Sequence, residues 1–276
     1  MLKKLIRHEW SETFKIPCLG LLTFLILSGI CALYFFLSPA LTADVELNVG
    51  NLFLFISYAF ISAALSLLIT VYLGIRYYKN LYTDEGYLMH TLPVPAWMHL
   101  TAKTINGVFW CYVLSLVTTV TVLPVTVIAL PKIGYLAPEE IAEIRTVCSM
   151  LLGNSLPELL FYFIPYLVSS VLFSVLLLYA AISLGQLFGK HRVFSSIICY
   201  LGLNALTSAV VSAFMVPGLT GMIITRIPDA TEDAMTLVFP TLMDTIFLAS
   251  LPAHLLLAAA CFVLCHYLLK KNLNLD

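Results

Sequence analysis

The sequence predicts an all-α membrane protein that crosses a bilayer six times. Of 276 residues, 61% are hydrophobic and 11% are charged, and the mean hydropathy is +0.99, whereas soluble domains carry about 25% charged residues. Six apolar runs each approach the roughly 20 residues that a helix needs to cross a bilayer. Lys and Arg gather in every second connection between these runs. Together, these observations predict a single transmembrane domain over residues 1–276.

The N-terminal segment, residues 1–15, is predicted to be an amphipathic helix in the membrane interface, although an ordinary polar leader is the alternative. Its charged residues fall away from an apolar stripe with helical spacing. The stripe consists of Leu2, Leu5, Ile6, Trp10 and Phe14. We expect Trp10 at headgroup depth, because its ring has an apolar body and a polar edge. Glu9 and Glu12 are expected on the polar side.

The six predicted spans have no Asp, Glu, Lys or Arg in their middle. They lie at about 17–38, 52–76, 105–130, 159–188, 193–216 and 243–269. Hydrocarbon offers the backbone no hydrogen-bond partner, so these runs should be helices. Of the two long connections on the predicted outer side, 132–157 should hold a helix that opens at Pro138. The other, 217–242, is apolar enough either to dip into the membrane or to lie on its surface.

The distribution of cations sets the predicted topology. Eleven of the 14 Lys and Arg residues lie at the two ends of the chain or in the second-to-third and fourth-to-fifth connections. Only Lys132, Arg145 and Arg226 lie in the other connections. Because an excess of Lys and Arg marks the cytoplasmic side, we expect a multi-pass protein of the cell membrane with both termini in the cytoplasm.

Catalytic and nucleotide-binding motifs are missing from the sequence. The Gly189-Lys190 pair lacks the glycine-rich loop that binds phosphates, and neither HExxH nor GxSxG occurs. The seven cysteines contain no CxxC pair, and only His254, Cys261 and Cys265 form a sequence cluster. We therefore expect no enzymatic activity, no bound cofactor or metal, and no nucleic-acid partner.

Three polar residues within the spans are candidates for a transport pathway. These are Asn106, Asn204 and His254. Polar groups in a membrane often line a pathway, but they also hydrogen-bond neighbouring helices, and both interpretations stay open here.

The connection 77–104 is the longest on the predicted cytoplasmic side. It begins with basic and aromatic residues, breaks at Thr83-Asp84-Glu85-Gly86, and should then hold a short helix that ends before Pro93-Val94-Pro95. Pro95 is suited to open the next helix, which continues through Lys103 into the third span. A short stiff helix between two spans suits a groove on another protein, although a plain interfacial loop fits the local chemistry as well.

The order Asp84-Glu85-Gly86, Leu92-Pro93-Val94 and Lys103 resembles the first cytoplasmic loop of type-2 ABC exporter permeases, in particular small bacterial members with a separate ATPase. The resemblance implies a coupling helix that docks on an ATPase subunit, which binds Mg-ATP. It implies coupling roles for Asp84, Glu85, Gly86, Leu88, Met89, Leu92, Pro93 and Lys103. It also implies a second permease copy, identical or different, and an N-terminal helix that braces the coupling helix. The segment 217–242 departs from the family pattern because it is more apolar.

Two other functional classes stay open. A non-transporting membrane protein, such as an immunity or sensor module, fits the composition and topology equally well. A membrane-embedded enzyme would need a nucleophile, base or metal ligands at one depth of the bilayer, and the sequence offers only the His254, Cys261 and Cys265 cluster.

Overall fold

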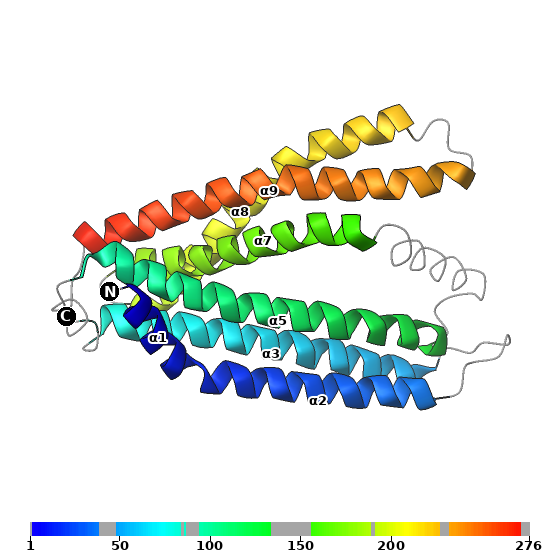
Figure 1. The fold of residues 1–276 in the computed structure, drawn as a ribbon, viewed down its shortest axis with the longest axis horizontal. Coiled ribbons are helices and arrows are strands. Elements are labelled where there is room, and N and C mark those ends of the chain that lie inside the picture. Colours follow the sequence, from blue (N-terminus) through cyan, green and yellow to red (C-terminus); the bar gives the residue numbers. More distant parts are fainter. Residues whose placement is uncertain are drawn as a thin grey trace. The chain divides into compact units, whose positions relative to one another are not determined.

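The computed structural model describes residues 2–38, 48–83, 86, 94–133, 156–188, 191–226 and 232–271. These residues form α-helices and contain no strand (Figure 1), which confirms the all-α prediction. The helices are α1 (Leu2–Thr13), α2 (Lys15–Leu37), α3 (Val49–Tyr82), α5 (Ala96–Ile133), α7 (Leu156–Gly185), α8 (Arg192–Arg226) and α9 (Glu232–Lys271).

All of these helices except α1 are long and apolar enough to cross a membrane, so the prediction of six spans is confirmed for the described residues. Most of the helices are longer than the predicted spans; α3, for example, continues to Tyr82 and α5 begins at Ala96. Helix α7 is shifted instead, from the predicted 159–188 to Leu156–Gly185. Hydropathy marks only the stretch that lies in hydrocarbon, whereas the backbone hydrogen bonds continue a helix through the interface.

The predicted connection 217–242 is mostly helical, and its place in or on the membrane stays a prediction. Residues 217–226 continue α8 and residues 232–242 belong to α9, and these two helices pack against each other. Pro217 and Gly218 suggested a helix end, but both residues are tolerated in membrane helices when neighbouring groups satisfy the backbone. The helix expected at Pro138 lies outside the described residues.

The chain divides into two compact units. We call residues 8–73 and 109–159 the α2 unit, and residues 1–7, 74–108 and 160–276 the α7 unit. The long helices α3 and α5 contribute residues to both units. This division leaves the prediction of one permease domain over residues 1–276 untested.

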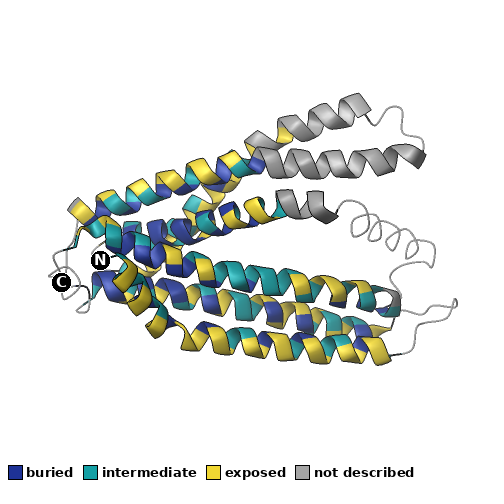
Figure 2. Cartoon of the chain, viewed as in Figure 1, coloured by how far each residue is buried: buried dark blue, intermediate teal, exposed yellow. Residues whose placement is uncertain are grey.

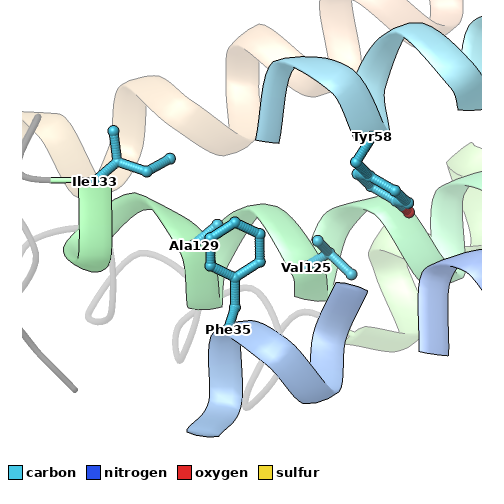
Figure 3. Close-up of a cluster of buried hydrophobic side chains, with 5 residues drawn as sticks. All are labelled: Phe35, Tyr58, Val125, Ala129 and Ile133. Atoms are coloured by element: carbon cyan, nitrogen blue, oxygen red, sulfur yellow. The ribbon is translucent and has the colours of Figure 1, made fainter. Parts of the chain in front are cut away.

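The α2 unit is a bundle of α2 with most of α3 and α5, which lie side by side (Figure 1). One apolar cluster joins the three helices, and Figure 3 shows the Phe35 ring of α2 lying against Ala129 of α5. Val125, Ile133 and the α3 residue Tyr58 complete this cluster. The small Ala129 side chain leaves room for the ring, so α2 packs closely on α5.

Lys132 closes one end of the α2 unit. Its ammonium group donates hydrogen bonds to the carbonyl oxygens of Phe35, Phe36 (3.2 Å) and Ser38 (2.5 Å). The last carbonyls of a helix lack partners within the helix and carry its negative dipole end, so a cation is stabilising there. Asn51 of α3 donates from Nδ2 to the Lys132 carbonyl oxygen at 2.8 Å. This structural role explains a lysine on the predicted outer side.

The α7 unit is organised around α7. In the apolar stretch of α7, 61% of the residues are buried, against 6% in that of α8. Figure 2 shows this contrast as dark blue residues on α7 and yellow ones on α8. Many of the exposed residues of α8 are large and apolar, as expected of a helix side that faces lipid.

Candidate functional site

A buried cluster of hydroxyl side chains fixes the end of α3 to α7. The Tyr77 ring stacks on the Tyr179 ring, with centroids 4.0 Å apart and an interplanar angle of 7°. The hydroxyl groups of Tyr77 and Tyr82 lie 3.1 Å and 2.9 Å from the Ser183 Oγ atom, and Tyr82 donates to it. We call Tyr77, Tyr82, Tyr179 and Ser183 the tyrosine–serine cluster. Because all four are buried, their hydrogen bonds are shielded from water and hold the two helices in one register.

The start of α5 is fixed to the same helix. The Tyr179 hydroxyl donates to the backbone oxygen of Lys103 at 3.3 Å. One turn further along α5, a Cβ atom added to Gly107 would lie 2.6 Å from the Tyr179 hydroxyl oxygen and 3.1 Å from a Val175 methyl group. Only glycine therefore allows α5 to approach α7 this closely. The helices that lead into and out of the connection thus share one support, α7.

Helix α9 closes the cluster from another side. Cys265 is fully buried and interacts with the Ser183 hydroxyl and with Tyr77. The cluster therefore joins the ends of α3, α7 and α9 that lie on the predicted cytoplasmic side, and α5 joins through Tyr179.

Gly86 has a packing reason that the sequence motif alone did not give. Its backbone N–H donates to the Thr83 oxygen at 2.7 Å, and a Cβ atom added there would lie 2.6 Å from the Leu81 carbonyl oxygen. Gly86 therefore lies so close to the end of α3 that a side chain there would collide with backbone. The other residues predicted to couple, apart from Lys103, lie outside the described residues: Asp84, Glu85, Leu88, Met89, Leu92 and Pro93.

The prediction that Pro95 opens the helix through Lys103 is confirmed. Helix α5 begins at Ala96, and the Met98 N–H donates to the Pro95 oxygen at 2.9 Å. The Lys103 side chain is only 4% exposed. Lys103 therefore packs within this chain, and its coupling role stays a prediction.

The predicted amphipathic helix at the N-terminus is confirmed as α1, but its apolar side meets protein. The ring centroid of Trp10 lies 4.3 Å from that of Phe109 and 5.8 Å from that of Trp110. Glu9, expected on the polar side, is 3% exposed, and Phe14, expected in the apolar stripe, is 46% exposed. The spacing rule failed at these two positions because α1 presents its buried side to a protein surface and not to a uniform apolar layer. Leu2, Leu5 and Ile6 are half-buried, and the position of α1 in the membrane interface stays a prediction.

The three candidate pathway residues lie in different environments. Asn106 of α5 and His254 of α9 are buried, whereas Asn204 of α8 is exposed. The His254 ring stacks at 5.6 Å on Phe173, and its Nδ1 atom has no hydrogen-bond partner in the described part of the chain. Nothing in these environments groups the three residues, and their pathway role stays a prediction.

Sequence reasoning singled out the aromatic start of the connection at Tyr77 but missed Tyr82, Tyr179 and Ser183. One signal was available, because Tyr179 and Ser183 stand four residues apart and so share a face of an otherwise apolar helix. Among the described residues, no three His, Cys, Asp or Glu side chains lie close enough to hold a metal ion. Comparisons with protein-family models, with curated proteins and with solved structures found no match.

Proposed function

We propose that this chain is the membrane-spanning permease subunit of an ATP-driven exporter of the type-2 ABC class. In this proposal, residues 77–104 dock on a separate ATPase subunit that binds Mg-ATP. A second permease copy, identical or different, completes the transporter. The protein sits in the cell membrane of a bacterium with both termini in the cytoplasm, as the distribution of Lys and Arg indicates.

One observation carries the proposal: both helices that flank residues 83–95 are held on α7. On the entry side, Tyr77 stacks on Tyr179 and shares Ser183 with Tyr82. On the exit side, Tyr179 bonds the Lys103 backbone oxygen. A segment on such a support transfers a push from a partner directly to a buried span, whereas a loop on free helix ends would absorb it.

The mechanism follows from linkage between ATP binding and the position of α7. If closure of two ATP-bound ATPases favours one position of the segment 77–104, the same free energy favours one arrangement of the spans. The tyrosine–serine cluster then acts as a rigid joint, because its stacked rings and buried hydrogen bonds resist a change of register. Substrate movement in turn biases ATP affinity by the same factor.

Charge reversal in the segment tests the proposal. The double variant Glu85→Lys with Leu88→Asp should lose the ATPase during purification, or keep it without transport, because the change places a charge in the expected apolar contact. The matched control is Glu139→Lys with Leu151→Asp, which makes the same chemical changes in the connection 132–157 on the predicted outer side. The control should leave ATPase association and transport intact.

The contradicting result is equally specific. If the Glu85 and Leu88 variant retains both its ATPase and its transport at the level of the control, residues 77–104 do not couple the chain to a motor. If no ATPase associates with the unmodified chain, the permease proposal itself is wrong.

A further inference from the structure

Helix α1 carries an exposed basic side. Lys3, Lys4 and Arg7 are exposed, and so is Lys15, the first residue of α2. Of the two carboxylates on α1, Glu9 is buried, and Glu12 is exposed with its Oε1 atom 3.2 Å from the His8 Nε2 atom. Four permanent cations thus face outward against one exposed carboxylate.

These four cations have no partner in the described part of the chain, in either hydrogen bonds or ion pairs. Lys3 and Arg7 stand four residues apart, so two like charges lie next to each other on the helix surface, which destabilises a helix unless an anion lies between them. Lys132 is a useful contrast, because its ammonium group is occupied by three carbonyl oxygens. The basic side of α1 therefore offers unused hydrogen-bond donors and uncompensated charge.

The other side of α1 is already occupied. Trp10 packs on Phe109, and Glu9 and Thr13 are buried. The side of α1 that carries Trp10 and Thr13 is thus used within the protein, and the basic side is the one left to contact the surroundings.

The place of α1 in the chain predicts that this basic side lies near the membrane surface. The first span begins at Lys15, and the side chains of Ile16 and Leu19 that follow are exposed, as expected of residues in contact with lipid tails. Lys15 therefore lies where hydrocarbon gives way to headgroups. Lys3, Lys4 and Arg7 precede Lys15 by no more than 12 residues, and the surface potential that attracts cations extends about 8–10 Å beyond the headgroups.

We propose that the basic side of α1, formed by Lys3, Lys4 and Arg7, binds anionic phospholipid headgroups of the adjoining leaflet. The phosphate oxygens accept hydrogen bonds from the ammonium groups, and the Arg7 guanidinium group can hold two of them at once. Headgroups on one side and α5 on the other then fix α1 in place. This inference does not depend on the proposed transport function.

Energy transfer to a labelled lipid tests the proposal. The full chain is placed in phosphatidylcholine nanodiscs that contain pyrene-labelled phosphatidylglycerol, and transfer from tryptophan to pyrene gives the preference for the anionic lipid. Of the three tryptophans, Trp10 lies on α1 and Trp110 packs against it, so the signal reports mainly on this site. The test variant is Lys3→Gln with Arg7→Gln, and the matched control, Lys270→Gln with Lys271→Gln, removes two cations from the end of α9.

The unmodified chain and the control should prefer phosphatidylglycerol over phosphatidylcholine. The test variant should lose this preference by a factor of about 5 for each cation removed, which is about 25-fold in total. The charge-preserving variant Lys3→Arg with Arg7→Lys should keep the preference, which separates loss of charge from misfolding. High salt should remove the preference of the unmodified chain.

Three results would overturn the proposal. The unmodified chain could show no preference for phosphatidylglycerol. The test variant and the control could lose the preference equally, which would indicate a general effect of cations. Inorganic phosphate at matched concentration could displace the labelled lipid, which would indicate a site for free anions and not for a lipid surface.

Discussion

The substitution Ser183→Ala removes one oxygen atom from the tyrosine–serine cluster and tests whether the cluster holds α3 on α7. Ser183 is 2% exposed, and its hydroxyl is within hydrogen-bond distance of both the Tyr77 and the Tyr82 hydroxyl groups. Alanine keeps the packing volume nearly unchanged, so the effect comes from the lost hydrogen bonds.

The expected loss of stability follows from two buried hydroxyl groups that lose their common partner. Each unsatisfied buried polar group costs about 1–3 kcal/mol, and partial relaxation of the two tyrosines places the total at about 2–4 kcal/mol. For a chain of this size, that corresponds to a fall in Tm of roughly 4–16 °C. Removing all three hydroxyls, in Ser183→Ala with Tyr77→Phe and Tyr82→Phe, should cost about 1 kcal/mol or less, because no polar group is then left unpaired.

Thermal unfolding with a thiol-reactive dye measures these differences. Cys265 is fully buried and interacts with Ser183, so its labelling reports the opening of the cluster itself. The matched control is Ser169→Ala, because Ser169 is a buried serine on the same helix whose hydroxyl donates to the Tyr166 backbone oxygen at 2.9 Å. Equal Tm values for the Ser183 and Ser169 variants, or no rescue by the two phenylalanines, would refute the reasoning.

Three further predictions address other parts of the molecule. Lys132→Met should lower Tm by roughly 4–8 °C, since about 2 kcal/mol is lost at the two partly buried carbonyls, whereas Lys132→Arg should keep most of the stability. Equal Tm values for the two variants in differential scanning fluorimetry would contradict the role of Lys132. Gly86→Ala should weaken ATPase co-purification because the added Cβ atom would collide with the Leu81 backbone, whereas Gly202→Ala should be neutral because nothing lies within 4 Å of the added atom. Equal co-purification of the two variants would count against a role of Gly86 in docking. Trp10→Ala should expose Phe109 and Trp110 of α5 and cost about 1–3 kcal/mol, measured by the protease resistance of the N-terminal region, and unchanged resistance would speak against the contact with Phe109.

The spans could be predicted from sequence because each is a long apolar run without a central charge, and only a helix satisfies its own backbone in lipid. The start of α5 was also predictable, because the chemistry of Pro95 is local. The continuation of α8 through Pro217 was not, because a proline that ends a helix in water is tolerated when neighbouring helices satisfy the backbone.

The contacts between helices were beyond the reach of sequence patterns. Tyr77 and Ser183 are separated by 106 residues, and an apolar helix gives little indication of which side faces a neighbour. From sequence, Lys132 was counted as an exception to the distribution of cations. In the fold, this α5 residue lies beside the end of α2, whose carbonyl oxygens accept its hydrogen bonds. Glu9 was placed on the polar side of α1 because it is charged. Its burial depends on a protein surface that helical spacing does not predict.

Photo-crosslinking from residue 88 tests the central claim most directly. A photoreactive phenylalanine derivative in place of Leu88, illuminated in living cells, should form an adduct whose peptides include a phosphate-binding loop of an ATPase. The same group in place of the exposed Leu206 of α8 should not form this adduct. If position 88 forms no adduct with an ATPase, or if a membrane-impermeant reagent reaches a cysteine placed there from outside the cell, the coupling role of residues 77–104 is contradicted.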